Sequence, residues 1–115
     1  MIQAAAIVCF ASVALLFTGC KKEETLDNID CSKVNAAYSA NIKPLINTNC
    51  VSSGCHNANS TNGDFTAHAG LKSKADNGSL NNRVIQQKNM PPSGSLTSDD
   101  LKKIKCWINS GSPNN

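Results

Sequence analysis

Hydrophobic residues near the C-terminus recur three and four positions apart, which is the spacing of one face of an α-helix. This stripe consists of Leu101, Ile104 and Ile108. Thr97 precedes it as a capping residue, with Asp100 three positions on as a variant of the capping box. Gly111 follows the last turn, where helices commonly end. The pattern predicts a terminal helix between Thr97 and Gly111.

Three shorter segments show the same periodicity. The first, residues 41–50, has Pro44 in its opening turn, where a proline is acceptable because backbone N–H groups there lack partners. The others are residues 64–75 and 80–88. No strand-like alternation of useful length accompanies them. The sequence therefore predicts an all-α domain of about three to five helices.

The hydrophobic points of these helices are the residues that we expect to form the core. We expect Trp107 to pack at the edge of the terminal helix face rather than at its centre. The expected core residues are Leu45, Ile46, Leu71, Val84, Ile85, Leu101, Ile104 and Ile108.

The N-terminus has a different pattern. Residues 4–17 form an almost unbroken apolar run that ends in Thr18-Gly19-Cys20. The run is too short for a stable transmembrane helix and is typical of a signal peptide, with an uncleaved membrane anchor as the alternative. Its end resembles a bacterial lipobox, although Phe17 stands where leucine is usual. In lipoproteins of that family the cysteine is lipidated and becomes the new N-terminus, which implies that Cys20 is a lipid anchor.

The lipobox resemblance implies three regions: a signal peptide at 1–19, a polar tether at 20–30 and a domain at 31–115. The Lys-Lys-Glu-Glu segment at positions 21–24 resembles a surface-export signal of lipoproteins in some Gram-negative bacteria, and a solvated tether is the alternative. We therefore expect the chain in the cell envelope of a Gram-negative bacterium. It would be held there by lipid, in the periplasm or on the outer-membrane surface.

The net charge and the length of the chain bear on which partners and cofactors are expected. The formal net charge of +3 is small and scattered, so it does not favour nucleic acid, which requires a clustered basic face. Roughly 80 residues remain for one domain, and such chains often add disulfides, metals or cofactors because they bury little apolar surface. Aromatic residues make up only 4% of this chain, which strengthens that expectation.

Two cysteines and a histidine form the most informative local motif. Cys50 and Cys55 are separated by four residues, and His56 follows directly. A Cys-x-x-Cys-His run is the usual attachment site of c-type haem. The spacer here is two residues longer, but it is small and polar, and Gly54 can adopt a positive φ, so the extra residues can bulge outwards. A buried haem would also provide the large apolar centre that the side chains lack.

If Cys50 and Cys55 hold haem, Cys31 and Cys106 remain as a disulfide pair in an exported protein. Their bridge would close a loop of roughly 75 residues and stabilise the fold by about 4 kcal/mol on chain-entropy estimates. On the terminal helix Cys106 lies about 140° from Leu101, away from the apolar face. The N-terminal segment must therefore cross the outer side of this helix as a strap.

Met90 is the favoured second axial ligand of the iron. It precedes Pro91 and Pro92, which stiffen the loop and hold it extended. Histidine–methionine ligation raises the reduction potential of a haem. Two alternatives stay open. One is that Met90 fills a gap in the core, as methionines do. The other is that His68 is the second ligand, although a structural or surface role is usual for a histidine in a helical pattern.

Together these motifs resemble the mono-haem c-type cytochromes of class I, and more narrowly lipoprotein cytochromes with Ile-x-Pro before the haem site and Met-Pro-Pro after it. The resemblance covers roughly residues 42–111. It implies that Cys50 and Cys55 are the covalent attachment points, His56 the proximal ligand and Met90 the distal ligand. The matching segments are Ile42-Lys43-Pro44-Leu45-Ile46, Cys50 to His56, Met90-Pro91-Pro92 and Leu101 to Ser110 with Cys106-Trp107.

The resemblance implies an electron carrier rather than an enzyme. We expect one covalent haem c, transient contacts with redox partner proteins, membrane attachment through Cys20, no nucleic acid and a monomer. Lys72, Lys74, Arg83 and Lys88 would be able to steer an acidic partner, although a merely solvated face is the commoner role of such residues.

Three other classes of protein remain as alternatives. Cys50, Cys55 and His56 would bind zinc only with a further ligand, and adjacent residues are awkward partners in one tetrahedral site. A plain Cys50–Cys55 disulfide would make this a small structural or binding lipoprotein without haem. A haem enzyme such as a peroxidase requires an open iron position, which Met90 would close.

Overall fold

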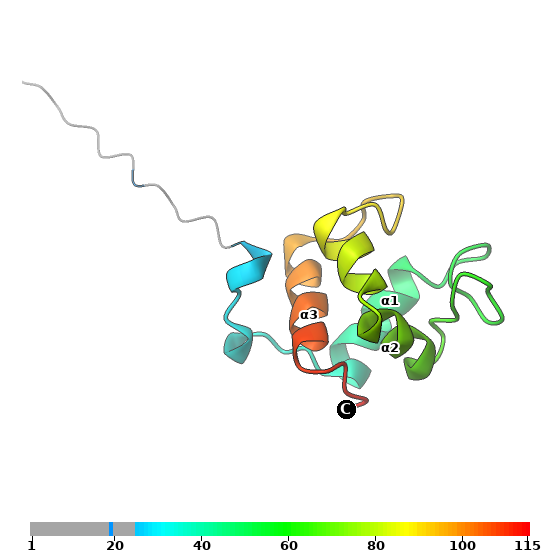
Figure 1. Ribbon diagram of the computed structural model, residues 1–115, viewed down its shortest axis with the longest axis horizontal. Helices are drawn as coiled ribbons and strands as arrows, with labels where there is room; N and C mark the ends of the chain where they lie inside the picture. Colours follow the sequence, from blue (N-terminus) through cyan, green and yellow to red (C-terminus); the bar gives the residue numbers. More distant parts are fainter. Residues whose placement is uncertain (1–18, 20–24) are drawn as a thin grey trace, which may run out of the picture.

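The computed structural model describes residue 19 and residues 25–115, and in this part of the chain all regular structure is helical (Figure 1). The prediction of an all-α fold class is confirmed for these residues. Two short 3-10 turns, η1 and η2, precede helices that wrap around one core, and η3 and η4 have π-helical turns. The elements are η1 (Leu26–Asn28), η2 (Cys31–Lys33), η3 (Tyr38–Ile42), α1 (Lys43–Asn49), α2 (His68–Asp76), η4 (Asn81–Gln86) and α3 (Ser98–Asn109).

The first long helix starts earlier than its sequence pattern predicted. Since η3 runs directly into α1, the helical path begins at Tyr38 rather than at Asn41. The Ile42 N–H donates to the Ala37 carbonyl, five residues back, over 3.2 Å. This is the wide turn of a π-helix. Pro44 falls in the first turn of α1, as predicted, directly after the wide turn of η3.

The second predicted helix, residues 64–75, begins late. The Thr66 N–H donates to Oδ1 of Asp64 over 2.9 Å, and local bonds of this kind compete with helix formation. For this reason α2 begins only at His68. Phe65 therefore enters the core from a loop, where it is 5% exposed.

The beginning of α3 agrees with the sequence prediction. The Asp100 N–H donates to the Thr97 hydroxyl over 3.2 Å, and the Thr97 N–H donates to the Asp100 carboxylate over 2.9 Å. These reciprocal bonds complete the predicted capping box.

The buried face of α3 is turned relative to the prediction. Trp107, expected at the edge, is fully buried, whereas Leu101 and Ile108, expected in the core, are only partly buried. The face is therefore centred between Ile104 and Trp107. The indole tolerates this position because its Nε1–H donates to the Pro113 carbonyl over 3.0 Å, so no polar group is left unpaired.

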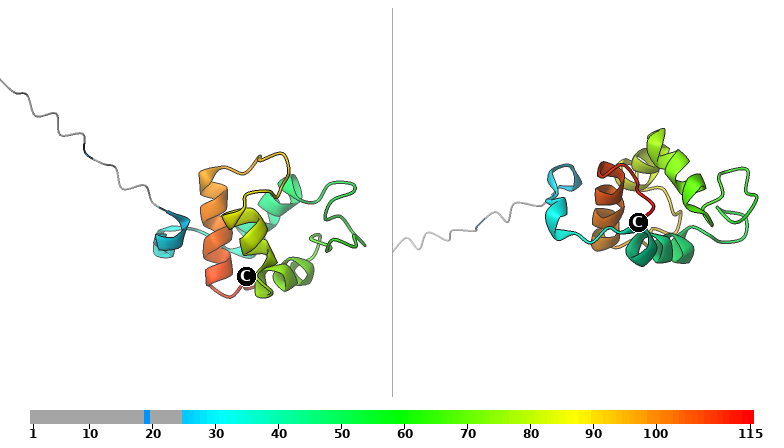
Figure 2. Two further views of the ribbon diagram at one scale, coloured as in Figure 1. Left: turned by 45° about the horizontal axis from the view of Figure 1, so that its top comes forward. Right: turned by 90° about the horizontal axis from the view of Figure 1, so that it is seen from below.

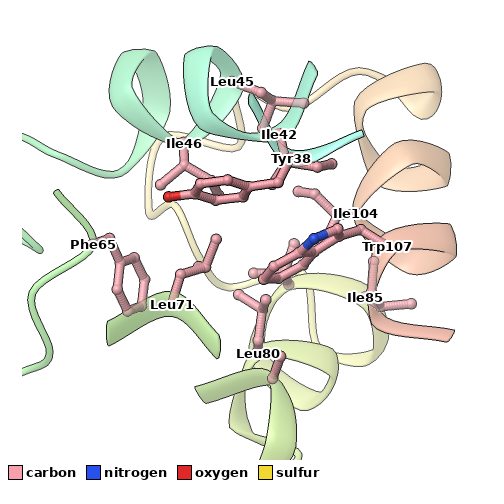
Figure 3. Packing of buried hydrophobic residues seen from close by; sticks show 12 residues of the cluster. Tyr38, Ile42, Leu45, Ile46, Phe65, Leu71, Leu80, Ile85, Ile104 and Trp107 are labelled. Carbon is pink, nitrogen blue, oxygen red and sulfur yellow. The ribbon is translucent and has the colours of Figure 1, made fainter. Parts of the chain in front are cut away.

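Trp107 lies at the centre of the core, where its ring stacks on Tyr38 with centroids 5.9 Å apart (Figure 3). Six of the eight expected core residues are buried, which confirms most of that prediction. These six are Leu45, Ile46, Leu71, Val84, Ile85 and Ile104. The buried hydrophobic residues that the prediction did not include are Tyr38, Ile42, Phe65, Ala75, Leu80, Cys106 and Trp107.

The N-terminal segment crosses α3 as a strap, which we define as residues 25–37. Cys31 and Cys106 are joined by a disulfide with their Cα atoms 5.4 Å apart. Leu26 of η1 packs against the core cluster, and η1 contacts α3. Cys106 is only 3% exposed, although it lies away from the apolar face of its helix, because the strap covers it. This is the path that the position of Cys106 on the helix required.

The predicted signal peptide and Cys20 lie outside the described residues, apart from Gly19. Within the described part of the chain, no helix is both long and apolar enough to cross a membrane.

Gly70 of α2 lies against the backbone of the loop before the helix. A Cβ atom added there would lie 1.7 Å from the Asp64 carbonyl oxygen. Helix propensity alone predicts that Gly70→Ala stabilises the protein, whereas this overlap forces the backbone to move. We expect a net destabilisation of about 1–3 kcal/mol, measured by guanidinium unfolding. Ser73→Ala, on an exposed position of the same helix, is the control and should stabilise slightly. A stabilising Gly70→Ala would show that Asp64 does not pack there.

Candidate cofactor site

The end of α1 delivers Cys50 to the site. The Cys50 N–H donates to the Ile46 carbonyl over 2.8 Å, and the residue caps the helix. The chain then loops out and returns, since the His56 N–H donates to the Cys50 carbonyl over 3.1 Å. Inside this loop the Cys55 N–H donates to the Ser52 carbonyl over 3.0 Å, and Gly54 has a φ of +80°. The loop thus brings both ends of the motif together.

The longer spacer therefore folds out of the way. Residues 52–54 are exposed, whereas Cys50 and Cys55 at the two ends are partly buried. Both thiols are free. The motif thus presents two sulfur atoms and an imidazole, as a two-residue spacer would, with the additional residues in solvent.

His56 is held by its backbone and by its ring. Nδ1 lies 3.0 Å from the Gly63 carbonyl oxygen, which only accepts hydrogen bonds, so Nδ1 carries the proton and donates. The unprotonated Nε2 then keeps its lone pair for a metal, and fixing one ring nitrogen in this way is typical of metal-ligating histidines. The ring also stacks on Phe65, with centroids 3.9 Å apart and planes 2° from parallel.

Met90 belongs to the same cavity and comes from a different part of the chain. Its N–H donates to the Arg83 carbonyl within η4 over 3.3 Å. The side chain is partly buried against the core, and Pro91 beside it is buried. The loop after η4 thus contributes the Met90 thioether to the cavity wall, and the Cys50–His56 loop contributes a separate part of that wall.

The cavity between these walls has a volume of about 420 Å³. That size lies within the usual range for pockets that hold a small molecule or cofactor. It brings together all four residues for which the sequence predicted haem contacts. Its lining residues are Asn49, Cys50, Gly54, Cys55, His56, Asn62, Phe65, Lys74, Ser79, Leu80, Arg83, Val84, Met90, Pro91 and Pro92.

These residues fit a covalently bound haem. The thiols are unpaired, the imidazole presents a free nitrogen, and the thioether sulfur is a neutral ligand suited to iron. Phe65, Leu80 and other apolar groups form much of the remaining wall. The two charged lining residues, Lys74 and Arg83, are both cations.

His68, the other candidate axial ligand, is not one of the residues that line this cavity. Its Nε2 lies 2.9 Å from the Ser112 carbonyl oxygen, and its ring meets Tyr38 edge-on with centroids 4.7 Å apart. This histidine ties α2 to the C-terminal segment, which is the structural role usual for such a residue.

Sequence reasoning did not identify Gly63 or Phe65 as parts of the site. Both act on His56, one through its carbonyl and the other through its ring. The available signal was the Gly63-Asp64-Phe65 turn shortly after the motif, because an Asx turn there brings the chain back. Arg83 and Asn49 were likewise not assigned to the cavity.

In the described part of the chain, no three His, Cys, Asp or Glu side chains converge in a way that would hold a metal ion by themselves. Zinc bound by Cys50, Cys55 and His56 therefore gains no support from this arrangement.

The Cys50 thiol should react slowly before any cofactor binds. Burial, and secondarily the charge of Cys55, raise the pKa of the Cys50 thiol to about 11. At pH 8 its thiolate fraction is then about a hundredfold below that of a thiol with the ordinary pKa of 9.0. Since the thiolate is the reactive form, we expect iodoacetamide to modify Cys50 of the haem-free protein slowly, and faster as the pH rises towards 11. Peptide mass spectrometry measures this rate.

The unfolded chain in guanidinium is the control for this reactivity, because unfolding removes the burial that raises the pKa. Cys50 should there react at the rate of an ordinary thiol. Equal rates for Cys50 in the folded and unfolded protein would contradict the burial of this thiol.

Comparisons with known proteins do not assign this chain to a family. A scan against protein-family models gives no match, and neither a search of curated proteins nor a search of solved structures gives one. The function is therefore inferred from the residues of this chain and their geometry.

Proposed function

We propose that this chain is a membrane-anchored mono-haem cytochrome c that transfers single electrons between redox partner proteins. The observation that supports it most is the shared cavity of Cys50, Cys55, His56 and Met90. These four residues come from two separate loops, and c-type haem binding requires this combination of two thiols, an imidazole and a thioether.

In this proposal each side chain has a separate task. The Cys50 and Cys55 thiols would each add across a vinyl group, so that sulfur bonds to one carbon and the thiol hydrogen passes to the other. Nε2 of His56 would be one iron ligand, with the Gly63 carbonyl holding the ring in place. The thioether sulfur of Met90 would be a second iron ligand and would raise the reduction potential.

A bound haem supplies a one-electron iron couple, and the chain controls its surroundings. Phe65, Leu80 and Val84 exclude water from the cavity, which disfavours the more highly charged iron state. The Cys50–Cys55 loop is exposed, so an edge of the group stays close to the surface for transfer. Electron-transfer contacts of this kind are small and transient.

The remaining parts of the proposal concern location and partners. Cys20 carries the lipid, residues 20–30 join this anchor to the domain, with residues 25–30 as the start of the strap, and the protein resides in a Gram-negative cell envelope as a monomer. Nucleic acid is not a partner, because the charge is small and scattered.

The principal alternative is a small disulfide-stabilised lipoprotein without haem. It requires Cys50 and Cys55 to pair, and they are free thiols here, whereas Cys31 and Cys106 are joined. It also leaves the cavity and the fixed imidazole of His56 without a role. A peroxidase-like enzyme is disfavoured because Met90 lines the same cavity as His56 and, as an iron ligand, would close the open position that catalysis requires.

A pyridine haemochrome spectrum tests the proposal. The protein would be produced together with haem-attachment proteins and purified under denaturing conditions. We expect the spectrum of a covalent haem, at one haem per chain. Absence of covalent haem under conditions that load another c-type cytochrome would overturn the proposal.

Met90→Ala should remove the sulfur ligand while leaving haem attached. We expect loss of the long-wavelength sulfur-to-iron absorption band of the oxidised protein and a lower reduction potential, because the thioether favours reduced iron. Optical spectra and a redox titration measure both. Ser93→Ala, at an exposed position of the same loop, is the control and should keep the band. A band that persists in Met90→Ala would exclude Met90 as the ligand.

A further inference from the structure

The strap and the cavity lie on different sides of the domain. Figure 1 and both views of Figure 2 show residues 25–33 beside α3 and the loop at 50–65 on the opposite side. The cavity lining agrees, because none of its residues comes from the strap or from α3. The chain thus enters the domain far from the place where the candidate haem site opens.

Two contacts hold the strap in this position. The disulfide joins Cys31 to Cys106 in the buried back of α3. Leu26 packs against the core cluster, which fixes the strap further towards the N-terminus. The point at which the tether leaves the domain is therefore part of the folded structure.

The length of the tether limits how the domain can turn. Residues 21–24 separate Cys20 from Thr25, and five extended backbone steps reach at most about 18 Å. A compact domain of this length is about 30 Å across, so its half circumference is about 45 Å. With a lipid anchor at Cys20, the tether is therefore too short for the domain to rotate until its cavity side faces the bilayer.

We infer that the anchored protein keeps its strap side towards the membrane and presents the cavity to the aqueous phase. There it takes a water-soluble electron-transfer partner rather than one embedded in the bilayer. This inference rests on the proposed function, because it takes Cys20 as the lipid anchor and the cavity as the haem site.

Spin labels on the lipidated holoprotein test the orientation. A nitroxide amino acid would replace Lys33 on the strap or Ser53 on the cavity-side loop, both of which are exposed. The protein would be bound to phosphatidylcholine vesicles with or without a nickel-chelating lipid, whose metal enhances relaxation of nearby labels. We expect several-fold greater enhancement at Lys33 than at Ser53. A flexible insertion of about 80 residues between Glu24 and Thr25 should remove the difference, because its r.m.s. reach of about 50 Å exceeds the half circumference of the domain.

The outcomes separate this inference from the proposed function. If the protein binds vesicles but Ser53 responds as strongly as Lys33, the orientation is wrong and the anchor stands. If the holoprotein does not bind vesicles, the lipid anchor is wrong and the orientation fails with it.

Discussion

Replacing both Cys50 and Cys55 with serine is expected to leave the protein without covalent haem. Serine oxygen does not form the thioether bond with a vinyl group, and the two thiols of the cavity are the only free ones that the described residues contain. Intact-mass spectrometry of the purified protein should then give the mass of the polypeptide alone. The native protein should be heavier by one haem.

Two matched variants make this result specific. Ser53→Ala lies in the exposed part of the same loop and should keep the haem, because the loop bulge does not enter the cavity. Cys55→Ser alone should retain a haem held by one bond. If the double serine variant carried covalent haem in the native amount, these cysteines would not be the attachment points.

The position of His56 explains why the longer spacer does not disrupt this arrangement. The Cys50 carbonyl accepts the His56 N–H directly, so the loop closes at its base whatever the length of its tip. The sequence supported a haem motif through the residue types and through Gly54. It did not indicate that Gly63 fixes the imidazole, because that contact depends on the path of the turn after the motif.

The helical periodicity of the hydrophobic residues predicted where the helices lie in the sequence better than it predicted which of their residues are buried. The capping residues located the start of α3, since Thr97 and Asp100 bond to the backbone whatever the domain around them. The buried side of the same helix depends on what covers it. Trp107 is buried because Tyr38 and the C-terminal residues lie over it, and Tyr38 belongs to a segment without a clear helical pattern in the sequence.

The convergence of the cavity residues was predictable only in part. The order of Cys50, His56 and Met90 along the chain suggested opposite walls, and all three line one cavity. Phe65 was assigned to a helix and is instead a loop residue stacked on His56. The hydrogen bond from the Thr66 N–H to Asp64 decides this difference, and helical periodicity carries no information about it.

Removing the Cys31–Cys106 disulfide by changing both residues to alanine is expected to destabilise the holoprotein by about 4 kcal/mol, because the bridge closes a long loop and restricts the unfolded chain. The sequence separation is 75 residues. For a domain this small, that amount is a large part of the total stability. Changing both residues also leaves no new thiol to compete for haem. Guanidinium unfolding at a fixed iron oxidation state measures the loss.

The same experiment distinguishes an effect on the unfolded chain from an effect on packing. A less restricted unfolded chain exposes more surface, so the dependence of the free energy on denaturant should steepen in the alanine variant. Lys33→Ala, on the same strap, is the control and should change little, because its ion pair with Asp30 is exposed. If the alanine variant were as stable as the native protein, the strap would not be held by the disulfide. The folded contacts of Leu26 and η1 with the core and α3 would then have to hold the strap by themselves.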